Sequence, residues 1–180
     1  WQAFAPSAVP IAEGWHIPQA LDEAGLSRIR EAFIDSTCRA ARLGLDAVEL
    51  HAAHGYLLHT FLSPVSNKRE DQYGGSFDNR VRFPLEILSA VRKAWPAEKP
   101  LIVRLSATDW IEGGWSLEQS IALAPLLEEA GCDVIHVSSG GVSPHQQLPS
   151  NGPGYQTGLA AAIRQPVSYT HLTLPTKNEV

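Results

Sequence analysis

The residues best suited to chemistry stand together at positions 51–56, where the sequence reads HAAHGY. Two imidazoles and a phenol follow directly on the short apolar run at 46–50. That run predicts a buried strand, and in parallel α/β folds ligands bind at the carboxyl ends of the strands. We therefore expect His51, His54 and Tyr56 to face a ligand.

The elements that must position these residues alternate along the chain. The sequence predicts helices at about 26–43, 77–95, 117–130 and 158–164, and strands at 47–51, 101–107 and 134–138. Strands separated by helices predict a parallel sheet, and long loops after the strands are typical of a (β/α)8 barrel. A doubly wound sheet is the alternative. Three strands make about three eighths of a barrel, so we expect an α/β fold in the form of a partial (β/α)8 TIM barrel, truncated at both ends.

Polar side chains fill one face of the three predicted strands. If side chains alternate, residues such as Leu50 point toward the helices and the opposite face carries a polar row. The members of that row are Glu49, His51, Arg104, Ser106, His136 and Ser138. Barrel interiors are ordinarily packed with branched apolar side chains, so this row indicates a bound polar ligand or a buried network. A purely structural Glu49–Arg104 ion pair is the simpler alternative.

Composition limits the classes of protein to consider. A hydrophobic fraction of 44% in 180 residues is enough for a core of ordinary single-domain size. The net charge of -5 includes no basic block, which argues against nucleic acid as a partner, and no apolar run is long enough to span a membrane. Cys38 and Cys132 lack metal-ligand or CxxC spacing, so we expect free thiols in a reducing cytoplasm.

Both ends of the sequence look like those of a piece of a longer protein. The chain contains no Met and opens on loop-like composition, which predicts that the natural beginning is missing. Residues 166–180 show neither helical nor alternating periodicity and resemble translated sequencing-adapter sequence. We therefore expect a non-native tail there, and a fragment of one domain at residues 1–165.

Four stretches resemble the old yellow enzyme family of flavin-dependent ene reductases, in particular its bacterial, thermophilic-like branch. They are APSAVP at 5–10, DAVELHAAHGYLLHTFLSPVSNKREDQYGGSFDNRVRF at 46–83, LIVRLSATD at 101–109 and VIHVSSG at 134–140. The resemblance implies an FMN-binding (β/α)8 barrel that takes hydride from NADPH and reduces an electron-poor alkene. It places residues 1–165 around the fourth to sixth strands of that barrel.

The resemblance also implies a role for each polar residue at the strand ends. His51 and His54 correspond to the pair that hydrogen-bonds the carbonyl or nitro oxygen of the substrate, and Tyr56 to the proton donor. Arg104 corresponds to the residue that faces the N1/O2 edge of the flavin, where a fixed positive charge favours the reduced cofactor. The stretch Ser138–Gly140 lies where the family brings its sixth strand close to the flavin.

Other interpretations of these residues stay open at this point. His51 and His54 are the candidate ligands of a metal-dependent lyase or hydrolase on the same barrel, although no third ligand stands at a suitable spacing. Tyr56 has the alternative role of packing against the barrel rim. His59 is predicted to be a satisfied or surface histidine, and Asn79–Arg80 to pin the long loop. We expect a cytoplasmic homo-oligomer with a small alkene as partner, binding neither nucleic acid nor membrane.

Overall fold

The computed structural model describes residues 2–149, 152–168 and 170–173, with the backbone alone described for the last range. Its main sheet holds four parallel strands, in the spatial order β3 (Val48–Ala52), β4 (Leu101–Ser106), β5 (Val134–Ser138) and β6 (Thr170–Thr173). Two short parallel strands, β1 (Phe4–Ala5) and β2 (Gln19–Ala20), form a separate pair. Helical crossovers join consecutive strands of the main sheet, as parallel pairing requires.

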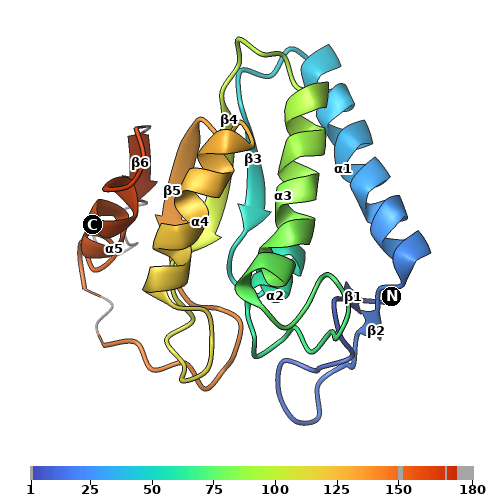
Figure 1. Cartoon of the computed structure of the whole chain (residues 1–180), viewed down its shortest axis with the longest axis vertical. Coiled ribbons are helices and arrows are strands. Elements are labelled where there is room, and N and C mark those ends of the chain that lie inside the picture. Colours follow the sequence, from blue (N-terminus) through green and yellow to red (C-terminus); the bar gives the residue numbers. More distant parts are fainter. Residues whose placement is uncertain (1, 150–151, 169, 174–180) are drawn as a thin grey trace.

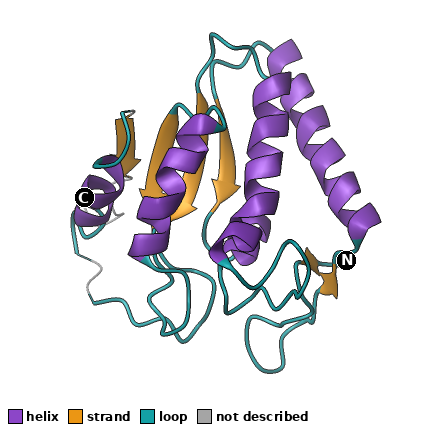
Figure 2. Ribbon diagram, viewed as in Figure 1, coloured by secondary structure: helices purple, strands orange, loops and turns teal. Residues whose placement is uncertain are grey.

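The helices cover one face of the main sheet. They are α1 (Glu23–Arg42), α2 (Leu57–Leu62), α3 (Phe77–Ala94), α4 (Leu117–Glu129) and α5 (Thr157–Arg164). Figure 1 shows α1, α3, α4 and α5 side by side, and Figure 2 shows them on the same side of the strands, with no described helix on the other. None of the described helices combines the length and apolarity needed to cross a bilayer. One-sided cover is the arrangement of a barrel segment, whose inner face lines the interior.

Local sequence explains where the long helices begin and end. The Asp22 carboxylate caps α1 by accepting a hydrogen bond from Gly25 N at 2.7 Å, and the Ser76 hydroxyl caps α3 by accepting from Asn79 N. Gly44 follows α1 with a φ of 74°, a left-handed conformation that favours glycine. The caps at Asp22 and Ser76 and the glycine at position 44 therefore set these helix ends.

Four elements were not predicted from the sequence: the two-residue strands β1 and β2, helix α2 and strand β6. Helix α2 occupies a stretch for which no element was predicted, because six residues are too few to show a helical period. Strand β6 lies within residues 166–180, where no strand was predicted, and it pairs in parallel with β5. The sheet therefore has four strands in the described part of the chain instead of three. A non-native origin of residues 166–180 stays a prediction.

The register of the sheet separates an apolar face from a polar one. His51 pairs with Arg104 across β3 and β4, and Arg104 pairs with His136 across β4 and β5. Alternation then sends the intervening side chains to the helix-covered face, where they are buried in the core: Leu50, Val103, Leu105, Ile135 and Val137. The predicted polar row is therefore confirmed on the face that the helices leave open.

Taken alone, this chain is expected to self-associate. In the described residues β3 has a strand partner on one side only, so its other edge exposes unpaired N–H and C=O groups. A closed barrel removes such edges, whereas an open sheet invites pairing with a second copy. Size-exclusion chromatography with light scattering should show oligomers or aggregates, and a monomer at all concentrations would contradict the expectation.

Candidate functional site

The candidate site lies at the carboxyl ends of β3, β4 and β5. Beyond β3 the chain turns through His54 and Gly55, with φ values of 58° and 75°. The turn brings the next side chains over the strand end, so that the His51 ring lies 5.4 Å from the His54 ring and 4.9 Å from the Tyr56 ring, centroid to centroid. Arg104 lies beside His51 on the neighbouring strand. The structure thus brings all four predicted site residues together.

Buried nitrogens without partners lie in a row across the three strands. They are Nδ1 of His51, Nε of Arg104 and Nε2 of His136, and none has a hydrogen-bond partner among the described residues. The three residues are consecutive register partners. Leaving a buried polar atom unpaired costs about 1–3 kcal/mol, so such atoms are normally satisfied. Three in one row indicate a surface that is completed by polar groups from outside the described residues.

The alternative of a structural Glu49–Arg104 ion pair is wrong. The Glu49 carboxylate reaches across β4 to His136, whose Nδ1 lies 2.7 Å from Oε2 of Glu49. Within the described part of the chain, no carboxylate forms an ion pair with Arg104. The positive charge of Arg104 is therefore available to a ligand.

His54 is held from two strands and kept neutral by its surroundings. Its Nε2 lies 2.6 Å from Ser138 Oγ, and its backbone N–H donates to Ser106 Oγ at 3.0 Å. Burial and then the positive charge of Arg104 lower the pKa of His54 to about 4, and the same two causes lower the pKa of His51. Both rings are therefore neutral near pH 7, a form that donates one hydrogen bond and accepts another.

The loop after β5 closes over the turn after β3. A Cβ added to Gly141 would lie 2.5 Å from His54 Cα, and one added to Gly55 would lie 2.5 Å from Gly141 O. The Ser106 hydroxyl donates to Gly140 O at 2.8 Å and ties the same loop to β4. Two loops far apart in sequence thus form one packed rim, which has no room for a side chain at either contact glycine.

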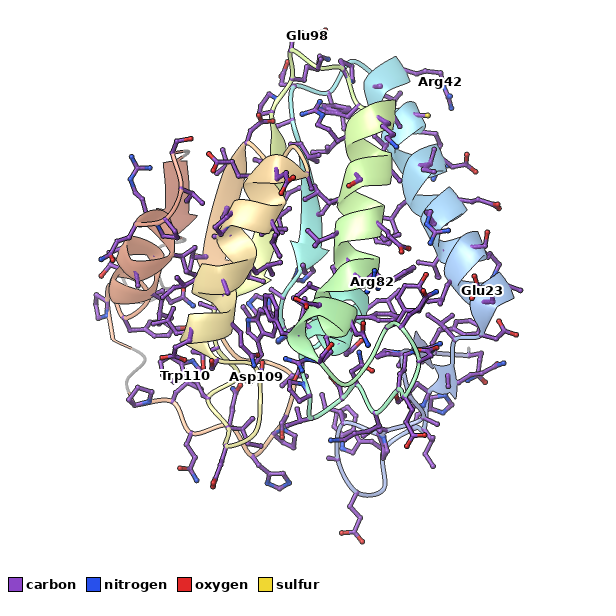
Figure 3. All side chains as sticks on the ribbon, in the orientation of Figure 1. Glu23, Arg42, Arg82, Glu98, Asp109 and Trp110 are labelled. Carbon is purple, nitrogen blue, oxygen red and sulfur yellow. The ribbon has the colours of Figure 1, made fainter. Side chains whose placement is uncertain are left out.

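A buried network that sequence reasoning missed lies against the turn. His59 accepts a hydrogen bond from Gly55 N at Nδ1 (2.8 Å), and its Nε2 lies 2.8 Å from Oδ1 of Asp109. The other oxygen of Asp109 accepts from Ser63 Oγ at 2.5 Å and from Trp115 N at 2.6 Å. Figure 3 shows Asp109 below the strand ends. The prediction of a satisfied His59 is confirmed, and the position of Asp109 just after a strand was the signal available in the sequence.

The residues predicted to pin the long loop at 63–75 do so. Arg80 is buried, and it donates from Nε to Leu62 O at 2.8 Å and from Nη1 to Gly75 O at 2.7 Å. Asn79 donates from Nδ2 to Gly74 O at 3.0 Å. The loop is therefore fixed to the start of α3, and this prediction is confirmed.

The cysteines and histidines of the described residues do not form a recognisable metal site. Cys38 and Cys132 are free, as expected, and burial raises the pKa of the Cys132 thiol to about 12. Among the described residues, no three His, Cys, Asp or Glu side chains converge as metal ligands would. His51 and His54 consequently find no third protein ligand there, and the metal-dependent alternative gains no support from this geometry.

Comparison with known proteins assigns the family. The chain matches the NADH:flavin oxidoreductase / NADH oxidase family over residues 4–153. The chain belongs to this family. It is 43% identical to an NADH:flavin oxidoreductase of Gibberella zeae over 175 residues and 42% identical to an NADPH dehydrogenase of Geobacillus sp. over 164 residues. Each alignment covers 91% of this chain but 42% and 47% of the relatives, so the chain spans less than half of their length.

Similar solved structures confirm the fold. A 2-naphthoyl-CoA reductase in complex with 2-naphthoyl-CoA superposes with a TM-score of 0.89 at 30% identity, covering 99% of this chain and 28% of that one. The old yellow enzyme homologue from Zymomonas mobilis has a TM-score of 0.78 at 24% identity, covering 97% of this chain and 51% of that one, which shows the likeness of fold. The α/β fold predicted from the sequence, a partial (β/α)8 barrel of the old yellow enzyme type, is confirmed.

The lowered pKa of His54 predicts a loss of stability in mild acid. The unfolded chain binds a proton near its ordinary pKa of 6.5, and the folded chain binds it only near about 4. The contribution of His54 to the free energy of unfolding should therefore decrease as the pH falls through that window and level off below it. Urea midpoints measured at about pH 7 and about pH 4.5 should differ less for His54→Gln than for the wild type. Equal differences would show that His54 does not carry this effect.

Proposed function

We propose that this chain is the central part of an FMN-dependent oxidoreductase that uses NADPH to reduce activated C=C bonds of α,β-unsaturated carbonyl or nitro compounds. Membership of the flavin oxidoreductase family supports the reaction class, and the Geobacillus relative, an NADPH dehydrogenase, supports NADPH as the hydride donor. The observation that carries the proposal is the row of buried, unpartnered nitrogens on His51, Arg104 and His136.

The residues at the site fit an FMN ring. The N1/O2 edge of the ring consists of hydrogen-bond acceptors, and a guanidinium donates to acceptors while adding a fixed positive charge. Arg104 has a buried Nε without a partner in the described part of the chain, and the strand register puts it on the polar face of the sheet. FMN would supply the hydride transfer, and the protein orients and polarises the reactants. Arg104 is therefore the proposed cofactor-binding residue.

His51 and His54 bind and polarise the substrate in this proposal. The hydroxyl of Ser138 lies 2.6 Å from His54 Nε2, and its donation there leaves the ring proton on Nδ1. His54 then donates from Nδ1 to the substrate oxygen, and the neutral His51 ring supplies a second donor. Two donors stabilise the negative charge that develops on the carbonyl or nitro oxygen as the β-carbon accepts hydride.

Tyr56 is the proposed proton donor. Its side chain is 62% exposed at the site, and its ring lies against the ring of His51. A phenol keeps its proton at neutral pH and is able to deliver it to the α-carbon. Hydride at the β-carbon and this proton at the α-carbon together saturate the double bond.

The proposed function is tested with a full-length protein that carries this segment. It should purify yellow, lose the flavin colour on anaerobic addition of NADPH, and regain it when cyclohexenone is added. A colourless protein, or a reduced flavin that the enone does not reoxidise, would overturn the proposal. Treatment with a chelator should leave the activity unchanged, whereas its loss would favour a metal-dependent enzyme.

Replacing His51 by Ala should slow the oxidative half-reaction. Loss of one donor to a developing oxyanion typically costs about 3 kcal/mol, which is on the order of a hundredfold in rate. Stopped-flow reoxidation by an enone should show this loss, with reduction by NADPH less affected. His16→Ala, at an exposed histidine of the amino-terminal loop, is the control. Wild-type reoxidation by His51→Ala would remove His51 from the mechanism.

Replacing Tyr56 by Phe should leave ligand binding intact and slow alkene reduction. The substitution removes only the hydroxyl, so substrate affinity is retained while the proton transfer, worth about 10²–10⁴-fold, is lost. Tyr73→Phe is the matched control. It also removes one phenol hydroxyl, but the buried Tyr73 contacts Glu86 of α3 and is not one of the proposed site residues. Normal turnover of cyclohexenone by Tyr56→Phe would show that solvent or another acid supplies the proton.

A further inference from the structure

We infer that His59 and Asp109 form a positioning pair, which holds the turn at His54–Tyr56 in the geometry that the reaction needs. Neither residue belongs to the proposed catalytic set, and both are fully buried. They lie 50 positions apart in sequence and meet between the end of β4 and the start of α2. The expected effect on enone reduction rests on the proposed function, whereas the expected effect on the conformation of the turn does not.

The direction of each hydrogen bond fixes the state of His59. The backbone N–H of Gly55 is able only to donate, so Nδ1 of His59 must accept and carries no proton. The single ring proton is therefore on Nε2, from which it is donated to Oδ1 of Asp109. Donors from Ser63 and Trp115 hold the other carboxylate oxygen. The pair therefore has one orientation, and that orientation presents a fixed acceptor to Gly55.

The turn needs such support because its backbone is strained. His54 has a φ of 58°, a left-handed conformation that costs a residue with a Cβ about 1–2 kcal/mol. Hydrogen bonds hold each residue of the turn: His54 N to Ser106 Oγ, Gly55 N to His59 Nδ1, and Tyr56 N to Ala53 O. Of these three, the bond to His59 is made by Gly55, which lies between His54 and Tyr56, two of the three residues proposed to act on substrate. Loss of this bond would leave the middle of the turn unsupported and loosen the positions of the side chains on either side of it.

Three variants separate positioning from stability. His59→Leu removes both ring nitrogens, and His59→Gln keeps one acceptor for Gly55 and one donor for Asp109 in a single amide. Asn67→Ala is the control for lost stability, because the buried Asn67 amide donates to Phe61 O of α2 and to Tyr73 O of the long loop. Rates are measured per bound FMN in the full-length enzyme, below the melting temperature of each variant.

His59→Leu should lower kcat for enone reduction on the order of tenfold to a hundredfold, because displacements near 1 Å at a reacting group have effects of that size. His59→Gln should recover most of the rate. Asn67→Ala should lower the melting temperature without lowering kcat per bound FMN. Equal kcat values for His59→Leu and wild type would overturn the inference. If His59→Leu does not fold, Ser63→Ala removes one donor to Asp109 and should give the same pattern at smaller amplitude.

An NMR titration of the His54 ring measures its pKa, and so reports the conformation of the turn without relying on activity. Burial is the main cause that lowers the pKa of His54, with smaller contributions from Arg104, His51, His59 and His136. A released turn exposes the ring, so the pKa should rise from about 4 toward its ordinary value in His59→Leu and stay low in His59→Gln. An unshifted pKa in His59→Leu would overturn the inference. A shifted pKa in an enzyme that does not reduce enones would support the positioning pair and overturn the proposed function.

Discussion

In a parallel sheet the register decides which side chains stand level with one another, and in this chain it aligns His51, Arg104 and His136 across three strands. The register itself is set by hydrophobic alternation, because a slip of one residue would turn the polar row into the core. Leu50, Leu105 and Ile135 are buried against the helices and so keep the polar side chains on the opposite face. The apolar residues, which take no part in chemistry, therefore determine where the chemistry is located.

Some nitrogen atoms of the candidate site are hydrogen-bonded within the protein, and others have no partner among the described residues. Glu49 is hydrogen-bonded to one nitrogen of His136, and Ser138 to one nitrogen of His54, so the protein orients each ring. The remaining buried nitrogens of His51, Arg104 and His136 have no partner among the described residues. A site that is oriented on one side and unsatisfied on the other is preorganised for a ligand, since the cost of ordering the side chains is met on folding.

Sequence patterns predicted the long elements and the polar face, because both depend on spacing within one segment. The helix at Phe77–Ala94 and the strand at Val134–Ser138 are long enough or apolar enough to show their period. The contacts that sequence reasoning missed depend on approach between distant segments: Glu49 with His136, and His59 with Asp109. No local pattern encodes which acid a histidine will meet, so neither contact could be predicted from the sequence alone.

The contact between Gly141 and the backbone of His54 limits which changes in the loop after β5 could alter the substrate range. Loop tips on barrels commonly vary in sequence and length to admit new substrates, while the scaffold stays constant. Here the loop after β5 touches His54 through a glycine that leaves no space for a side chain. An insertion that moves residue 141 would therefore move His54, the proposed substrate-binding histidine in the turn after β3. Natural diversification and laboratory evolution of this loop should consequently be confined to positions beyond that contact, or be accompanied by changes in the segment after β3.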